Sequence, residues 1–127
     1  MEEFILEASD RHPQVHLRNG CIHIQGPSIP LDAKEFYNPV IQWVKTYVKD
    51  PAPFTEVSIH IDYYNCDSTI AILDILKMLA ICQNTNQDIK ITFKWIYNKE
   101  DESIKELGAF LESKSDVRFG YYEQISS

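Results

Sequence analysis

Several common features are scarce or missing in this 127-residue sequence, and each absence excludes a class of protein. Only four glycines occur, and no glycine-rich phosphate loop, nucleophile elbow or triad spacing is present. No apolar run reaches the roughly 18–20 residues that a membrane-spanning helix needs. The opening Met-Glu-Glu-Phe lacks the basic region of a signal peptide. Neither a membrane span nor a cleaved leader is expected.

Basic residues and cysteines are also few. Lys and Arg number 12 against 19 Asp and Glu, and the resulting net charge of −7 disfavours binding to nucleic acid or to an anionic membrane. The three cysteines are odd in number and widely spaced, with no Cys-x-x-Cys motif. This pattern predicts a reduced, cytoplasmic protein without a disulfide framework.

The length and composition indicate one soluble globular domain spanning residues 1–127. Hydrophobic residues make up 44% of the chain and charged residues 24%, which is ordinary for a folded domain. A chain of this length buries a core without disulfide or metal staples.

The stretch 57–83 organises the chain. Apolar and polar residues alternate from position 57 to 64, which predicts a strand with one buried face. Its predicted buried side chains are Val57, Ile59, Ile61 and Tyr63. The apolar run from Ile70 to about Gln83 is too long for one strand and predicts a helix. That helix is apolar on more sides than one sheet covers, so part of it is deep core or a docking surface.

Residues 65–69, Asn-Cys-Asp-Ser-Thr, separate this strand from the helix. The short oxygens of Asp67, Ser68 and Thr69 can cap the free N–H groups of the first helical turn. The same hydroxyls can instead accept a phosphate, which unpaired N–H groups and the positive end of the helix dipole would stabilise. The residues alone leave both interpretations open.

A hairpin is predicted within 15–24, because Asn19-Gly20 is a favoured pair for a two-residue turn. The turn opposes His16 and His23 across the two strands and places Cys21 on the same face. These three side chains are potential metal ligands but lack a fourth. A polar, solvated strand face is the simpler interpretation, and no metal is expected.

The rest of the chain continues the alternation of strands and helices. Asp32 with Glu35 fits a short capped turn, and Asn38-Pro39 fits an N-cap followed by proline at the first helical position. The remaining predicted elements are strands at 4–9, 89–97 and 117–125 and helices at 39–48 and 101–113. Their predicted buried helical side chains are Val40, Trp43, Val44, Tyr47, Ile104, Leu107, Phe110 and Leu111. Because each strand keeps a polar face, we expect a mixed sheet in an α/β fold with helices mostly on one face.

Five segments resemble those of the SiaC-type bacterial regulatory phosphoproteins, in the same order and with similar spacing. They are 26–30 (Gly-Pro-Ser-Ile-Pro), 37–43 (Tyr-x-Pro-Val-x-x-Trp), 63–69 (Tyr-Tyr-Asn-Cys-Asp-Ser-Thr), 95–97 (Trp-Ile-Tyr) and 106–110 (Glu-Leu-Gly-Ala-Phe). The resemblance implies a fold like the STAS-type anti-sigma-factor antagonists, with Thr69 in register with the phosphoacceptor and Ser68 as the alternative. It also implies a partner switch that involves a protein kinase, a PP2C-like phosphatase and a GGDEF diguanylate cyclase. The unphosphorylated form would bind and activate the cyclase, which affects c-di-GMP signalling and biofilm formation.

The excess apolar surface of the helix, beside a modifiable hydroxyl, places the predicted docking surface over the turn and the start of the helix. Its residues are Asn65, Cys66, Asp67, Ile70, Ile72 and Leu73. No cofactor and no catalytic residue are expected. Two other functions remain open: a small enzyme that uses His60 and Asp62 on one strand face, and a scaffold that works without phosphate.

Overall fold

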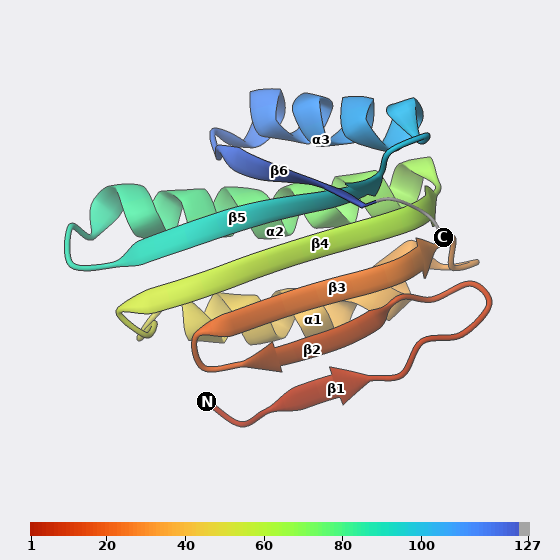
Figure 1. The fold of residues 1–127 in the computed structure, drawn as a ribbon. Helices are drawn as coiled ribbons and strands as arrows, with labels where there is room; N and C mark the ends of the chain where they lie inside the picture. The colour runs from red at the N-terminus through yellow and green to blue at the C-terminus, as the bar shows by residue number, and fades with distance from the viewer. Residues whose placement is uncertain (125–127) are drawn as a thin grey trace.

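The structure is a computed structural model that describes residues 1–124, and these form one six-stranded sheet and three helices (Figure 1). The strands are β1 (Phe4–Leu6), β2 (Gln14–Arg18), β3 (Cys21–Ser28), β4 (Phe54–Tyr64), β5 (Lys90–Asn98) and β6 (Phe119–Gln124). The helices are α1 (Ala33–Tyr47), α2 (Cys66–Thr85) and α3 (Glu102–Ser115). The predicted end of the last strand, Ile125, lies outside the described residues.

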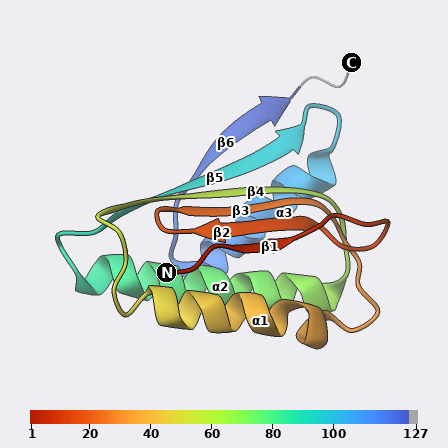
Figure 2. The same cartoon turned by 90° about the horizontal axis from the view of Figure 1, so that it is seen from below.

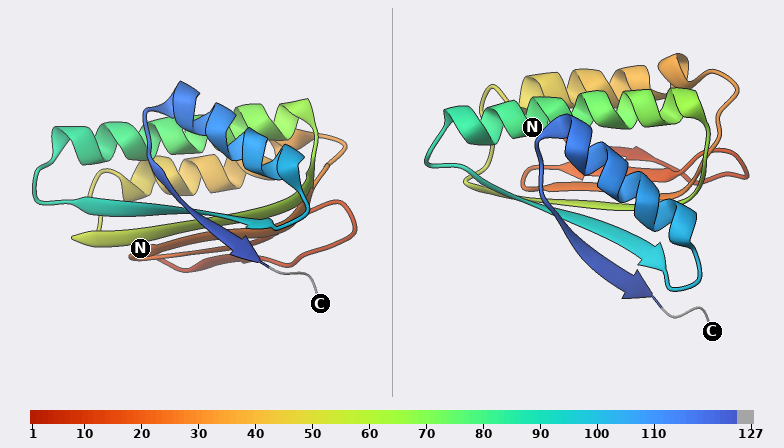
Figure 3. Two further views of the ribbon diagram at one scale, coloured as in Figure 1. Left: turned by 45° about the horizontal axis from the view of Figure 1, so that its top comes forward. Right: turned by 90° about the horizontal axis from the view of Figure 1, so that it is seen from above.

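The strands lie side by side in sequence order across the sheet. The first two pairings, β1–β2 and β2–β3, are antiparallel, and the other three are parallel. Each parallel pair is joined by a helix, and successive crossovers of the same hand place their helices on the same face. Figure 2 shows α1 and α2 below the sheet, and Figure 3 shows all three helices on one side. The predicted mixed sheet with helices on one face is confirmed.

The β2–β3 hairpin has the predicted register. His16 lies opposite His23, and Gly20 adopts a φ of 86°, which favours glycine. The alternate side chains of both strands face the helices and are fully buried; they are Val15, Leu17, Ile22 and Ile24. The two-residue turn thus sets which faces of both strands enter the core.

Helix α1 begins earlier than predicted. Its N-cap is Asp32, whose Oδ1 accepts a hydrogen bond from the Glu35 N–H at 3.1 Å. The predicted start at Asn38-Pro39 was wrong, because Pro39 lies inside the helix. An interior proline removes one backbone hydrogen bond. The Asp32 cap and the complete burial of Tyr37 in the first two turns stabilise the helix despite that loss.

Trp95 on β5 is the largest fully buried side chain of the core. Its Nε1 donates a hydrogen bond to the Ile104 carbonyl of α3 at 2.9 Å. A Cβ atom at Gly108 would lie 2.6–2.8 Å from the Trp95 ring, so α3 approaches β5 this closely only because position 108 is glycine. The close approach of α3 to β5 therefore depends on the pairing of Trp95 with Gly108.

Two predicted core residues are exposed instead. Tyr63 is 69% exposed and Phe110 is 50% exposed. Tyr63 lies near the end of β4, beyond Ile59, the last residue of β4 that pairs with β5. No helix in the described part of the chain is long and apolar enough to cross a membrane.

Candidate phosphorylation turn and docking surface

The candidate site is the first turn of α2, which follows β4 directly (Figure 1). Its N-cap is Asn65, whose Oδ1 accepts a hydrogen bond from the Ser68 N–H at 2.9 Å. Asn65 also forms hydrogen bonds with the last residue of β3 and with the segment that follows it. Its Nδ2 donates to the Pro30 carbonyl at 3.1 Å, and its N–H donates to the Ser28 carbonyl at 3.2 Å. These contacts fix the residue at which α2 begins.

The predicted helix start near Ile70 was wrong, since α2 begins at Cys66. Ser68 and Thr69 are therefore helical residues rather than caps, and the Thr69 N–H already donates to the Asn65 carbonyl at 3.2 Å. Asn65 takes the cap position because its amide also reaches Pro30. Both hydroxyls still lie close to the N-terminus of α2, where the helix dipole favours negative charge.

Ser68 belongs to a buried network of hydroxyl groups. Its side chain is inaccessible to solvent, and its Oγ accepts a hydrogen bond from the Ser28 Oγ at 2.8 Å. The Ser28 Oγ also lies 2.6 Å from the Tyr37 hydroxyl. The network joins the end of β3 to α1 and α2. A phosphate on Ser68 would be buried there without a cation, at a cost of several kcal/mol.

Burial raises the pKa of Tyr37 to about 12, although the hydrogen bond to Ser28 lowers it slightly. Folding therefore favours the neutral phenol. The resulting contribution to the stability of the fold is fully present below about pH 10, the pKa of tyrosine in the unfolded chain. It is lost as the pH rises from about 10 towards 12, and amounts to at most about 3 kcal/mol. Urea unfolding at pH 8, 10 and 11.5 should show a shallower alkaline loss of stability for Tyr37→Phe than for the natural chain. Equal losses would contradict a neutral, buried Tyr37.

Thr69 differs from Ser68 in accessibility. Its side chain is partly exposed, and its Oγ1 donates a hydrogen bond to the Cys66 carbonyl at 2.6 Å. Giving up this local bond costs about 1 kcal/mol, because water replaces the partner. The geometry thus favours Thr69 over Ser68 as a modifiable hydroxyl.

Three of the predicted docking residues form an exposed surface at the start of α2. Ile70 is 58% exposed, and Cys66 and Asp67 are exposed beside it. Asn65 and Leu73 are only partly exposed, and Asn65 is occupied as the N-cap. The surface therefore centres on Ile70.

Ile72 was wrongly assigned to the docking surface. It is fully buried in the core. It follows Ser68 by one helical turn, and both side chains face inward together with Ile75 and Leu79. Once the helix is known to start at Cys66, the period of 3.6 residues predicts this burial.

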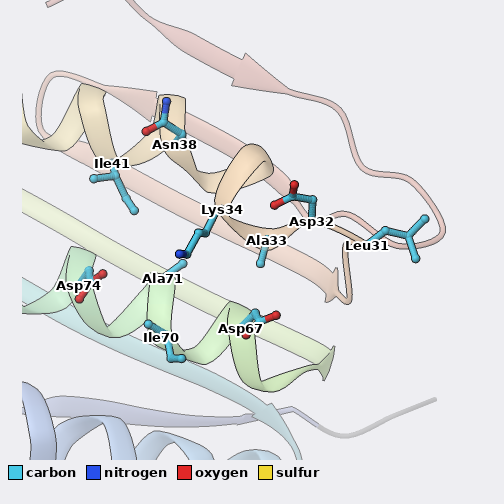
Figure 4. Close-up of a pocket in the computed structure, with 10 residues that line it drawn as sticks. All are labelled: Leu31, Asp32, Ala33, Lys34, Asn38, Ile41, Asp67, Ile70, Ala71 and Asp74. Carbon is cyan, nitrogen blue, oxygen red and sulfur yellow. The ribbon is translucent and has the colours of Figure 1, made fainter.

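A groove between α1 and α2 borders the exposed turn (Figure 4). It has a volume of about 520 Å³. Asp67, Ile70 and Asp74 of α2 form one wall, and Lys34 of α1 extends across it from the other side. Leu31, which is 89% exposed, lies at one end. The groove was not predicted from the sequence, because it depends on how α1 packs against α2.

The two alternative sites considered from the sequence, the His60–Asp62 pair and a metal cluster, are less well organised than the first turn of α2. The Nε2 of His60 lies 3.6 Å from the Asp62 Oδ1, beyond hydrogen-bonding distance, and His60 is buried. His60 does not line the cavity of about 360 Å³ that Asp62 helps to form. Within residues 1–124, no group of three or more His, Cys, Asp or Glu side chains is arranged to hold a metal.

Comparison with known families identifies relatives of this chain. The family model described as SiaC family regulatory phosphoprotein matches residues 6–124, which include all of α1, α2 and the groove between them. The chain belongs to the SiaC family. A protein of Pseudomonas aeruginosa strain UCBPP-PA14 with no described function is 28% identical over 102 residues, which are 80% of this chain and 78% of that protein.

Solved structures of SiaC share the fold. SiaC of Pseudomonas aeruginosa matches with a TM-score of 0.83 and 23% identity, over 99% of this chain and 100% of that one. A chain in the crystal structure of the diguanylate cyclase SiaD in complex with its activator SiaC, from the same organism, matches with a TM-score of 0.83 and 21% identity. That match covers 95% of this chain and 99% of the other. The predicted resemblance to the SiaC family is confirmed, whereas the likeness to anti-sigma-factor antagonists stays a prediction.

Proposed function

We propose that this SiaC-family chain is a non-enzymatic partner-switch protein whose unphosphorylated form binds and activates a diguanylate cyclase. The observation that carries the proposal is the accessible Thr69 hydroxyl in the first turn of α2, beside the exposed Ile70. The crystal structure of SiaD with its activator SiaC supports the choice of a GGDEF cyclase as the partner. Through c-di-GMP, the switch would regulate biofilm formation.

Phosphorylation of Thr69 by a dedicated protein kinase turns the switch off, and a PP2C-like phosphatase restores it. The exchange takes place in the cytoplasm, where the three cysteines, all free in the described residues, stay reduced. Thr69 is favoured over Ser68 because Ser68 has no solvent-accessible surface and its hydroxyl is already bonded. The added charge of about −1.5 to −2 then lies on the surface that the partner covers.

The first test combines phosphorylation with cyclase activation. The protein is incubated with the cognate kinase and ATP, and the modified residue is located by peptide mass spectrometry. One phosphate is expected on Thr69. The unphosphorylated protein should raise the rate of c-di-GMP synthesis by the cyclase, and the phosphorylated protein should not.

Ser68→Ala and Thr69→Ala are the matched controls for this experiment. Ser68→Ala should still take up one phosphate, although it should lose about 1 kcal/mol of stability through the missing hydrogen bond. Thr69→Ala should take up none and should still activate the cyclase. Phosphate on Ser68 alone would reassign the acceptor. If the variant Ser68→Ala/Thr69→Ala, which lacks both hydroxyls, were regulated like the natural chain, the protein would be a scaffold that works without phosphate.

A further inference from the structure

We propose that Ser28, Tyr37 and Ser68 are positioning residues for phosphorylation, because their buried hydroxyl groups hold the first turn of α2 in the position that orients Thr69 for the kinase. This inference rests on the proposed function, since it takes Thr69 as the phosphoacceptor. It deepens that function by assigning a role to three side chains that have no solvent-accessible surface of their own.

The first turn of α2 is attached to the core by a single side chain. Of residues 66–70, which form this turn, only Ser68 is buried. Buried apolar side chains follow it at Ala71 and Ile72. Segments with few buried apolar contacts open more readily than the centre of a helix. The position of the turn relative to the sheet therefore depends on the hydrogen bond of the Ser68 hydroxyl.

The three hydroxyl groups form one directed chain. Ser28 is the last residue of β3, and its single hydroxyl hydrogen is donated to the Ser68 Oγ at 2.8 Å. The hydrogen between the Ser28 Oγ and the Tyr37 hydroxyl, 2.6 Å apart, must then come from the phenol. Figure 2 shows the starts of α1 and α2 at the same end of the sheet as the end of β3. Loss of the Ser28 hydroxyl breaks both bonds of this chain.

A second anchor, Asn65, holds the backbone of the same turn. Its Oδ1 accepts a hydrogen bond from the Ser68 N–H, and its own N–H donates to the Ser28 carbonyl. Ser28 thus contacts both anchors, one through its hydroxyl and the other through its carbonyl. Because Thr69 directly follows Ser68 in the helix, a displacement of Ser68 also displaces the Thr69 hydroxyl.

Phosphoryl transfer requires accurate placement of the accepting oxygen. The Thr69 Oγ1 forms a bond to the γ-phosphorus of ATP, its proton passes to a base of the kinase, and ADP leaves with the oxygens roughly in line. A displacement of about 1 Å from such an arrangement can lower a rate about a hundredfold. A loosened first turn should therefore slow the transfer step more than it weakens binding of the kinase.

The test is a single-turnover measurement of Thr69 phosphorylation, with the cognate kinase and ATP in excess over the full-length protein. Tyr37→Phe should lower the maximal rate about fivefold and Ser28→Ala about tenfold. The kinase concentration that gives half the maximal rate should change by less than about twofold. Ser68→Ala should still reach one phosphate per chain, but as slowly as Ser28→Ala. The double variant Tyr37→Phe/Ser28→Ala should be no slower than Ser28→Ala alone, because both changes break the same chain.

Tyr47→Phe is the matched control, because it removes an equally buried hydroxyl from the other end of α1. This hydroxyl lies 2.6 Å from the Thr55 Oγ1 and accepts hydrogen bonds from the N–H groups of Gly20 and Ala52. Tyr37 lies about 15 Å away along the helix. Tyr47→Phe should lose at least as much stability as Tyr37→Phe and yet change the phosphorylation rate by less than about twofold. Melting curves compare the stabilities and verify that each variant is folded.

The proposal is overturned if the network variants react as fast as the natural chain, or if Tyr47→Phe slows the reaction as much as Tyr37→Phe. A change in the half-maximal kinase concentration alone would also overturn it, because the effect would then lie in binding. Tyr37→Phe leaves the bond between Ser28 and Ser68 in place, so it decides the matter if Ser28→Ala does not fold.

These outcomes are distinguishable from a failure of the proposed function. In each of them, Thr69 of the natural chain is still phosphorylated, so only the positioning role is lost. If the natural chain takes up no phosphate on Thr69 from a kinase that is active on another substrate, the proposed switch fails, and the positioning role fails with it.

Discussion

The phosphorylated protein is expected to bind the cyclase at least about a hundredfold more weakly than Thr69→Ala. Docking over the first turn of α2 must remove water from the phosphate, and burial of an unpaired charge costs several kcal/mol in practice. A loss of about 3 kcal/mol already exceeds a hundredfold in affinity. Titration calorimetry of both proteins against the cyclase measures the difference.

Thr69→Glu and Thr69→Gln separate charge from size. The two side chains have nearly the same shape, but only Glu is charged, and its single charge is smaller than that of phosphate. Thr69→Glu should therefore weaken binding at least about tenfold, whereas Thr69→Gln should have a smaller effect. Equal affinities of the two variants would mean that the switch acts through size rather than through charge.

The fold should tolerate the charge at position 69. A negative side chain in the first turn of a helix is favourable by about 0.3–1 kcal/mol, although the neighbouring Asp67 offsets part of this. Thr69→Glu should consequently melt within a few degrees of the natural chain. A collapsed melting curve would mean that modification acts by unfolding α2 rather than by blocking the partner.

The strands were predictable because side-chain alternation and turn chemistry are local. Asn19-Gly20 fixed the register of β2 and β3, including the opposed His16 and His23. The alternation in β4 predicted the burial of Val57 and its neighbours, but it failed at Tyr63. That residue continues the apolar pattern beyond the part of β4 that pairs with β5. Alternation shows which side chains lie on the same face of a strand, but not whether another element covers that face.

The helix starts were harder to predict because they depend on tertiary contacts. Residues 65–69 contain several side chains that can cap a helix, and the choice of Asn65 follows from its hydrogen bond to Pro30, 35 positions away in sequence. In α1, the Asn38-Pro39 pair resembles a helix start, but the Asp32 cap and buried Tyr37 extend the helix through it. Residues that can start or cap a helix thus occur both at the true starts of α1 and α2 and at positions inside these helices.

The accessibility of the two candidate hydroxyls can be predicted only when the start of α2 is placed correctly. With α2 starting at Cys66, Ser68 shares a side with Ile72, Ile75 and Leu79, which a period of 3.6 residues places towards the sheet. Thr69 is rotated by about 100° from that side and is partly exposed. The groove could not be found from the sequence, because it depends on how α1 packs against α2.

Ile72→Ala is expected to destabilise the protein by about 2–5 kcal/mol, because truncation of a fully buried Ile loses apolar contacts and leaves a cavity. For a chain of this size, the melting temperature should fall by about 10 °C or more. Denaturant unfolding and thermal melting both measure the loss. The folded fraction should still bind the cyclase with unchanged affinity, because Ile72 does not reach the surface.

Ile70→Ala is the matched control, since it makes the same substitution two positions earlier in α2. Ile70 is 58% exposed, so little buried contact is lost, and alanine has the higher helix propensity. Stability should change by less than about 0.5 kcal/mol, while affinity for the cyclase should fall because Ile70 lies at the centre of the proposed docking surface. If instead Ile72→Ala melted normally and bound weakly, Ile72 would belong to the interface and the position of α2 on the sheet would be wrong. Opposite responses of these two neighbouring isoleucines would separate the core side of α2 from its docking side.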